Sequence, residues 1–314
     1  MQNTVETPNT LGTRSWGPAK PDERTIVSTP LLDIEVMQWN PDGQRSIILA
    51  HGWPDSADGW GAVAAALAHA GWRVIVPSLR GFGQTTFRNP DTPRSGQLSA
   101  LGRDMVDLIG GMGLKKPALV GHDWGARAVA NAVGLEPDIA SHLVLISVGY
   151  GTNSPDQAMS MEQTRRYWYH WLMATPRGEK TVREQGKDFA RIMWNTWSPE
   201  GWYSEAEFEH AATAFTNPDW ADITLHSYRH RWGHAEGFAE YATEEQWLHP
   251  APEVHVPTLI LHGEQDYCNV PEMSAGKESY FEGRYERVLL PGVGHFPQRE
   301  DPVSVAREIL RFCQ

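Results

Sequence analysis

Short, uninterrupted runs of apolar residues alternate along the chain with stretches in which apolar residues recur every three or four positions. Continuous runs are typical of strands covered on both faces, and the spacing of three or four is typical of helices with one buried face. Six strands are predicted, at residues 46–50, 73–77, 118–121, 143–148, 258–261 and 287–290. The helical spacing is clearest over residues 101–112, and Asp301 followed by Pro302 predicts the capped start of a last helix. The pattern predicts an α/β protein with a mostly parallel sheet flanked by helices.

The alternation is interrupted between about residues 149 and 251, where no strand pattern is clear. Eight of the fourteen tryptophans lie in this segment, at Trp168, Trp171, Trp194, Trp197, Trp202, Trp220, Trp232 and Trp247. They could form the core of a helical subdomain or the apolar underside of a lid over a substrate pocket. We favour a lid because the segment follows the carboxyl end of a strand, where open α/β sheets place their sites.

These observations divide the chain into three parts. We predict an N-terminal arm at residues 1–25, an α/β core at residues 26–148 and 252–314, and an inserted helical cap at residues 149–251. With 314 residues, of which 40% are hydrophobic, the chain can bury one continuous core.

The charge balance and the hydropathy narrow the range of partners. The net charge of -12 argues against a nucleic-acid partner, because phosphate binding needs clustered lysine and arginine. No stretch approaches the roughly 20 uninterrupted apolar residues needed to span a bilayer. The first residues also lack the basic-then-apolar order of a signal peptide. We therefore expect no membrane association and a cytoplasmic location.

The two cysteines do not suggest a disulfide framework, a metal site or a redox pair. Cys313 shares helical spacing with Ala306, Ile309 and Leu310, which favours a buried core thiol. The sequence contains no metal-ligand cluster and no phosphate-binding loop, so we predict that the protein uses no cofactor.

The sequence GHDWG places Asp123 between Gly121 and Gly125, where an apolar run gives way to a helical pattern. A sharp turn between strand and helix needs small residues on both sides, and it lifts the central side chain above the sheet. A carboxylate there could be a nucleophile. It could also simply cap the following helix, and the motif alone leaves both readings open.

Three further motifs follow predicted strands. HGWP at residues 51–54 could turn backbone N–H groups inward or could be a plain turn. HGEQD puts Asp266 just after a strand, and PGVGHFPQRED puts His295 on the loop after the last strand. A nucleophile, an acid and a histidine in this chain order, each after a strand, follow the pattern of the α/β-hydrolase fold.

With HGWPDSADGW, LRGFGQTTF, GHDWGARA, HGEQD and GVGHFPQRED, the chain resembles α/β-hydrolases of the epoxide hydrolase and haloalkane dehalogenase group, from about residue 25 to residue 314. The resemblance implies that Asp123 is the nucleophile, since a carboxylate can displace a leaving group at a saturated carbon and become esterified. It also implies that His295, oriented by Asp266, activates the water that attacks the Asp123 carboxyl carbon. SVGYG at residues 147–151 contains no carboxylate, which favours Asp266 as the orienting acid and leaves Glu264 as a minor rival.

The same resemblance assigns the oxyanion hole to the backbone N–H groups of Trp53 and Trp124. It further implies a cis peptide bond between Trp53 and Pro54, which would aim the first of these donors. Loss of one such donor typically costs about 3 kcal/mol of transition-state stabilisation.

The cap determines which leaving group suits the site. An opening epoxide needs an acid for its departing oxygen, and a tyrosine pair is suited to that task because phenols are protonated at neutral pH. By resemblance, RYWYHWLMATP and LHSYRHRWG supply Tyr169 and Tyr228. Tyr167 competes for the first role, and Tyr228 could instead only seat the lid. Trp168 and His170 are candidate substrate-binding residues.

Two departures separate the chain from dehalogenases. Trp53 stands where haloalkane dehalogenases commonly have asparagine. Fluoroacetate dehalogenases have arginine where Trp124 stands and a His-Trp pair where this chain has Tyr169 and His170. Without that arginine, an anionic substrate would be bound poorly.

We therefore predict a cofactor-independent epoxide hydrolase that converts a mainly apolar epoxide to a vicinal diol, as a monomer or homodimer. The alternatives are a haloalkane or haloacid dehalogenase with the same Asp-His-Asp machinery, and a small-molecule-binding protein on this fold that performs no catalysis.

Overall fold

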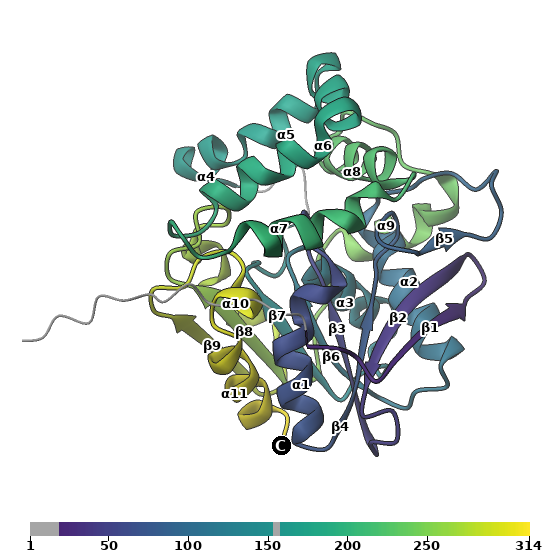
Figure 1. Cartoon of the computed structure of the whole chain (residues 1–314), viewed down its shortest axis with the longest axis vertical. Helices are drawn as coiled ribbons and strands as arrows, with labels where there is room; N and C mark the ends of the chain where they lie inside the picture. Colours follow the sequence, from purple (N-terminus) through teal and green to yellow (C-terminus); the bar gives the residue numbers. More distant parts are fainter. Residues whose placement is uncertain (1–18, 153–157) are drawn as a thin grey trace, which may run out of the picture.

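A nine-stranded sheet crosses the molecule in the computed structural model, which describes residues 19–152 and 158–314 (Figure 1). The strand order is β1-β2-β4-β3-β6-β7-β8-β9, with the short strand β5 paired to β2. Six strands are mutually parallel: β3 (Arg45–Ala50), β4 (Trp72–Pro77), β6 (Ala118–His122), β7 (His142–Ile146), β8 (Thr258–Gly263) and β9 (Tyr285–Leu290). These are the six predicted strands, so the predicted α/β class is confirmed.

Three further strands were not predicted. They are β1 (Glu23–Ser28), β2 (Leu32–Trp39) and β5 (Thr86–Phe87), and each is antiparallel to its neighbours. The boundary of the N-terminal arm at residue 25 is therefore wrong, because β1 begins at Glu23 and pairs along its whole length with β2. Residues 1–18 of the predicted arm lie outside the described residues.

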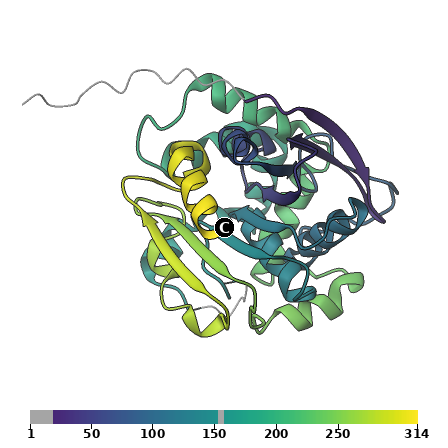
Figure 2. The ribbon, with the colours of Figure 1, turned by 90° about the horizontal axis from the view of Figure 1, so that it is seen from below.

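Helices cover both faces of the sheet (Figure 2). On one face lie α1 (Gly61–His69) and α11 (Pro302–Phe312), and on the other lie α2 (Leu98–Gly111) and α3 (Trp124–Leu135). Asp301 caps α11 as predicted, accepting a hydrogen bond from the Ser304 N–H at 3.0 Å, and Cys313 is fully buried beside it. Shorter elements complete the core: η1 (Ala57–Trp60), η4 (Pro271–Ser274), η5 (Glu278–Tyr280) and α10 (Pro297–Glu300).

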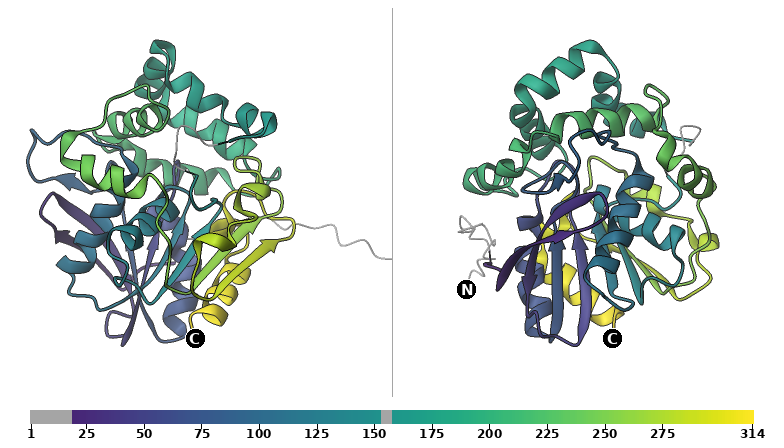
Figure 3. Two further views of the ribbon diagram at one scale, coloured as in Figure 1. Left: turned by 180° about the vertical axis from the view of Figure 1, so that it is seen from behind. Right: turned by 90° about the vertical axis from the view of Figure 1, so that its right-hand side faces the viewer.

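Between β7 and β8 the chain forms helices that lie above the carboxyl ends of the strands (Figures 1 and 3). They are α4 (Met161–Arg166), α5 (Trp168–Met173), α6 (Pro176–Thr196), α7 (Glu205–Ala212), η2 (Thr213–Thr216), α8 (Trp220–Arg231), η3 (Ala239–Tyr241) and α9 (Ala242–Leu248). None of the described residues between 149 and 251 belongs to a strand. We call these helices the cap. Across residues 19–152 and 158–314, no helix is long and apolar enough to cross a bilayer.

Buried polar contacts fasten the cap to the core. The Arg299 guanidinium pairs with Asp55 of the core at 2.7 Å and with Glu207 of α7 at 2.9 Å. The Trp194 indole N–H of α6 donates to the Pro54 carbonyl at 2.7 Å. Breaking a buried ion pair leaves an uncompensated charge, so these contacts favour a fixed position of the cap over the strand ends.

Candidate active site

Asp123 occupies the sharp turn between β6 and α3, with φ 49° and ψ −112°. Only close backbone packing permits this turn. A Cβ on Gly121 would collide with the backbone of Gly125, and a Cβ on Gly125 would collide with the backbone of Ala50. A positive φ is costly for a residue with a side chain and is commonly retained at functional sites. The two glycines therefore hold Asp123 in a conformation that lifts its carboxylate above the sheet.

The Asp123 carboxylate is almost buried, with 7% of the residue exposed, and it makes no capping bond to α3. One oxygen, Oδ1, accepts the backbone N–H of Trp53 at 3.0 Å. The other, Oδ2, lies 4.0 Å from His295 Nε2. The Trp53–Pro54 peptide bond is cis, as expected from the resemblance. Trp124 is the first residue of α3, so its N–H is among those that have no partner within the helix.

Asp266 holds His295 from the opposite side. Its Oδ2 lies 2.9 Å from His295 Nδ1, and its Oδ1 accepts the backbone N–H groups of Cys268 and Asn269 at 2.8 Å each. Burial alone would raise the pKa of Asp266, but the adjacent His295 and His262 outweigh burial and hold that pKa well below its usual value. Asp266 is therefore charged at neutral pH. Glu264, its rival in the sequence, is exposed.

His295 is fully buried, and its Nε2 has no hydrogen-bond partner among the described residues. Burial lowers its pKa, but the carboxylates of Asp266 and Asp123 outweigh burial and raise the pKa above the ordinary value. In the neutral ring Nδ1 donates its hydrogen to Asp266, so the Nε2 lone pair faces Asp123. The loop is anchored by Ser198, whose hydroxyl accepts the His295 N–H at 2.8 Å.

Aromatic rings from the cap lie over Asp123. The Trp53 indole stacks on Tyr169, with ring centroids 5.7 Å apart and planes 7° apart, and meets the edge of Tyr228 at 5.1 Å. The Tyr228 hydroxyl accepts the Trp124 indole N–H at 3.2 Å, and the Tyr169 hydroxyl lies 3.5 Å from Cys268 Sγ. Burial raises the pKa of both phenols well above 10, so both are protonated at neutral pH.

The neighbouring aromatic residues divide into two groups. Tyr167 donates its hydroxyl to Asn269 Oδ1 at 2.6 Å, which commits its proton away from Asp123. Trp168 is 37% exposed, and its ring packs edge-on against Phe189 and Tyr169 on the outer side of α5. We therefore withdraw Trp168 from the substrate-binding set, because α5 turns this side chain outward.

His170 is buried beside the tyrosines, with its ring centroid 4.5 Å from that of Tyr228. Its Nδ1 accepts the Trp232 indole N–H at 3.0 Å. Burial, followed by the charges of Arg231 and Arg127, holds the pKa of His170 well below its usual value, so the ring is neutral. An accepting Nδ1 places the hydrogen on Nε2, which has no partner in the part of the chain that the structure describes.

The sequence analysis overlooked two side chains next to this site. His262 Nε2 lies 3.2 Å from Asp266 Oδ2, and the HGEQD motif did contain this residue. Arg231 lies one helical turn after Tyr228 on α8, with its Cζ 5.2 Å from the Tyr228 ring centroid. The spacing of three from a predicted pocket residue was the available signal for Arg231. The described residues contain no group of three or more side chains suited to hold a metal ion.

Comparisons with known proteins agree with this arrangement. A family model for the alpha/beta hydrolase fold matches residues 45–302. Epoxide hydrolase A from Mycobacterium tuberculosis is 26% identical, covering 93% of this chain and 97% of that protein. An epoxide hydrolase from Caballeronia sordidicola is 26% identical, with 86% and 87% covered. The solved structure of a candidate epoxide hydrolase from Klebsiella pneumoniae aligns with a TM-score of 0.88 and 36% identity, covering 93% of this chain and 97% of that one. The predicted resemblance to epoxide hydrolases is confirmed.

Proposed function

The chain belongs to the α/β-hydrolase fold family, and we propose that it is an epoxide hydrolase that forms a transient ester on Asp123. The observation that carries the proposal is the arrangement around this carboxylate. One oxygen is held by the Trp53 N–H, and the other faces a histidine nitrogen that has no partner among the described residues. Two protonated phenols lie above them. This arrangement suits a carboxylate nucleophile and a separate base for water.

In the first step, Asp123 Oδ2 attacks an epoxide carbon, and the bond between that carbon and the epoxide oxygen breaks. We assign Oδ2 as the nucleophile because Oδ1 already accepts the Trp53 N–H and is thereby held as the future ester carbonyl oxygen. Tyr228 and Tyr169 hydrogen-bond the departing oxygen, and one of them gives up its proton. A phenol is a suitable donor because the leaving alkoxide is far more basic than a phenolate.

In the second step, water attacks the carboxyl carbon of Asp123 while His295 Nε2 accepts a proton. The separation of 4.0 Å between Nε2 and Oδ2 exceeds a direct hydrogen bond and is compatible with a bridging water. The oxyanion forms at Oδ1, where the N–H groups of Trp53 and Trp124 stabilise it. His295 then protonates the leaving alcohol oxygen. The proton left on the regenerated carboxyl replaces the one that the phenol gave up, so water adds across the epoxide as a vicinal diol.

The electrostatics change between the two steps in a useful direction. In the free enzyme the Asp123 charge contributes to the raised pKa of His295. Esterification removes that charge, so the pKa of His295 falls just when the ring must act as a neutral base. Asp266 remains charged and continues to orient the ring.

A substrate panel tests the proposal against the dehalogenase alternative. Terminal, styrene-type and disubstituted epoxides are assayed beside matched chloro- and fluoro-compounds, with diol and halide measured together. We expect diol formation from at least one class of epoxide and little halide release. Halide release without diol formation would favour a dehalogenase, and saturable binding without either product would favour a binding protein. A cytoplasmic location, a monomeric or homodimeric state and the absence of nucleic-acid partners remain predictions of the sequence.

A further inference from the structure

Buried arginines in this protein have a consistent way of being neutralised. Arg80 directs its Nε and Nη2 atoms at the Asp104 carboxylate, with both distances 2.6 Å. Arg299 directs the same two atoms at Asp55 Oδ1, at 2.9 and 2.7 Å. This edge of the guanidinium presents two parallel N–H groups, which match the two oxygens of a carboxylate.

Arg231 is the exception. It is 92% buried, because only 8% of the residue is exposed, and its Nε and Nη2 atoms have no hydrogen-bond partner among the described residues. None of the ion pairs formed by residues 19–152 and 158–314 includes Arg231. A guanidinium stays charged at every physiological pH, so this edge is a buried positive charge without a counter-ion.

A cavity of about 390 Å³ lies along this side chain, between α8 and α9 of the cap and α2 and α3 of the core. Its inner wall contains buried Arg231 and Ser227, and the Ser227 hydroxyl also lacks a partner in the described structure. Its rim reaches exposed residues such as Gln246. The cavity also contains Glu245, but this carboxylate is engaged by the N–H and hydroxyl of Ser99. The unpartnered groups on the wall are therefore hydrogen-bond donors, one of them charged.

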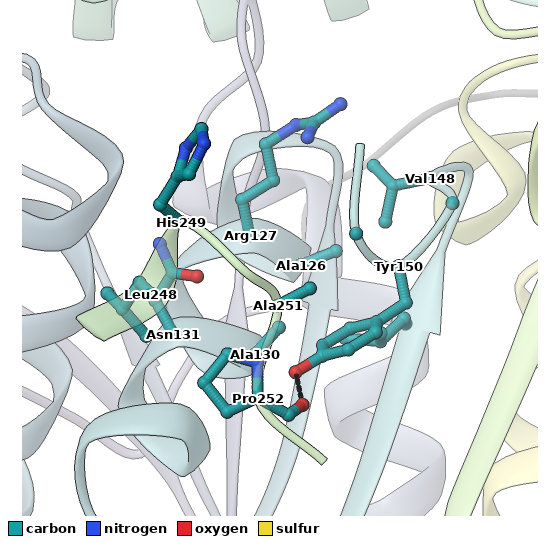
Figure 4. A pocket seen from close by; sticks show the side chains of 13 residues that line it. Ala126, Arg127, Ala130, Asn131, Val148, Tyr150, Leu248, His249, Ala251 and Pro252 are labelled. Carbon is teal, nitrogen blue, oxygen red and sulfur yellow. Dashed lines mark hydrogen bonds between the residues drawn. The ribbon is translucent and has the colours of Figure 1, made fainter. Parts of the chain in front are cut away.

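The cavity adjoins the proposed proton donors. Tyr228 follows Ser227 directly on α8, and its ring lies 5.2 Å from Arg231 Cζ. A second, smaller pocket of about 20 Å³ shares Asn131, Leu248 and His249 with the cavity (Figure 4). Arg127 lines this smaller pocket and adds a second buried positive charge within one helical turn of Asp123.

We propose that the substrate is an epoxide carrying a carboxylate, and that Arg231 binds this carboxylate through its Nε and Nη2 edge while the epoxide oxygen lies at Tyr228. This inference rests on the proposed epoxide hydrolase function. It revises the expectation of a mainly apolar substrate: the aromatic rings contact the carbon skeleton, and the guanidinium contacts an anionic end. The neutral Nε2–H of His170, beside Tyr228 and within the field of Arg231, supplies another donor for the same molecule.

The test uses terminal epoxides whose chains end in a carboxylate after one to six methylene groups, each paired with its methyl ester. The value of kcat/KM for diol formation is measured for every acid and every ester. We expect the wild-type protein to prefer at least one acid over its ester by tenfold or more. We expect Arg231→Met to lower that acid-to-ester ratio at least tenfold, and Arg231→Lys to retain part of the preference.

Arg229→Met is the matched control. Arg229 lies on the same helix, but it donates to the Met173 carbonyl and to Glu179, so the acid-to-ester ratio should not change. A preference for the ester at every chain length, or the same ratio in wild type and Arg231→Met, would overturn the proposed carboxylate site while leaving the hydrolase function intact. Absence of diol from every acid and every ester, and from the neutral epoxides of the first panel, would instead overturn the proposed function itself.

Discussion

The core and the cap hold their functional side chains by different means. In the core, Asp123 and His295 stand on loops at strand ends, where tight backbone turns and hydrogen bonds to Trp53 and Asp266 fix each carboxylate and ring. In the cap, Tyr169 and Tyr228 are held chiefly by ring packing around Trp53. The core can therefore perform the covalent steps with fixed geometry. The cap supplies protons and chooses the substrate, and these tasks tolerate more variation.

If this division is correct, core substitutions should stop turnover, whereas cap substitutions should slow one step or change substrate preference. The largest effect is expected from Asp123→Asn, because an amide is not a competent nucleophile at the epoxide carbon. We expect kcat/KM for diol formation to fall by at least about 10⁴-fold. Asp301→Asn, which makes the same chemical change at the cap of α11, should leave turnover close to wild type. Residual activity above about one per cent in Asp123→Asn would break the assignment of the nucleophile.

His295→Gln should separate the two covalent steps. Alkylation does not require the base, so the ester on Asp123 should form and persist, and steady-state turnover should fall by about 10³-fold or more. Intact-protein mass spectrometry should detect an added mass equal to that of the epoxide. The double variant Asp123→Asn with His295→Gln should carry no added mass. An adduct that also forms in this double variant would move the covalent chemistry to another residue.

The cap tyrosines should affect the first step alone. We expect Tyr228→Phe and Tyr169→Phe each to slow alkylation by about 10²-fold, with hydrolysis of the ester almost unchanged. Stopped-flow measurement of tryptophan fluorescence in single turnovers can separate the two rates. Tyr167→Phe is the control, because its hydroxyl is committed to Asn269, and alkylation should change less than about threefold. A larger loss in Tyr167→Phe than in Tyr169→Phe would reverse the assignment of the first tyrosine.

The smallest effect concerns pH. Hydrolysis of the ester needs neutral His295, so its rate should fall about tenfold per pH unit as the pH drops below the pKa of that ring. In the free enzyme, Asp266 and Asp123 raise this pKa above its ordinary value despite burial. The ester lacks the Asp123 charge, so the acidic limb for ester hydrolysis should lie at lower pH than the titration of His295 in the free enzyme, measured by NMR. A limb at equal or higher pH would contradict the proposed change in charge.

The sequence predicted the core more completely than the cap, for physical reasons. Strands such as β6 are buried on both faces and appear as continuous apolar runs, whereas β1 lies at the sheet edge with exposed and half-buried residues and gives no such run. Asp123 could be located because glycines must flank its turn. In the cap, the rotation of each helix depends on packing against several neighbours. The sequence therefore could not indicate that Trp168 points outward or that Arg231 is buried beside Tyr228.

The central claim, that a protein carboxylate is esterified and then cleaved at its own carbonyl carbon, is tested most directly by a single turnover in ¹⁸O-labelled water. Enzyme is kept in excess over epoxide, and both the diol and the peptide containing Asp123 are analysed by mass spectrometry. We predict one heavy oxygen in the Asp123 carboxylate and an unlabelled diol. A labelled diol with no label in the protein would mean that water attacks the epoxide itself, and it would contradict the account.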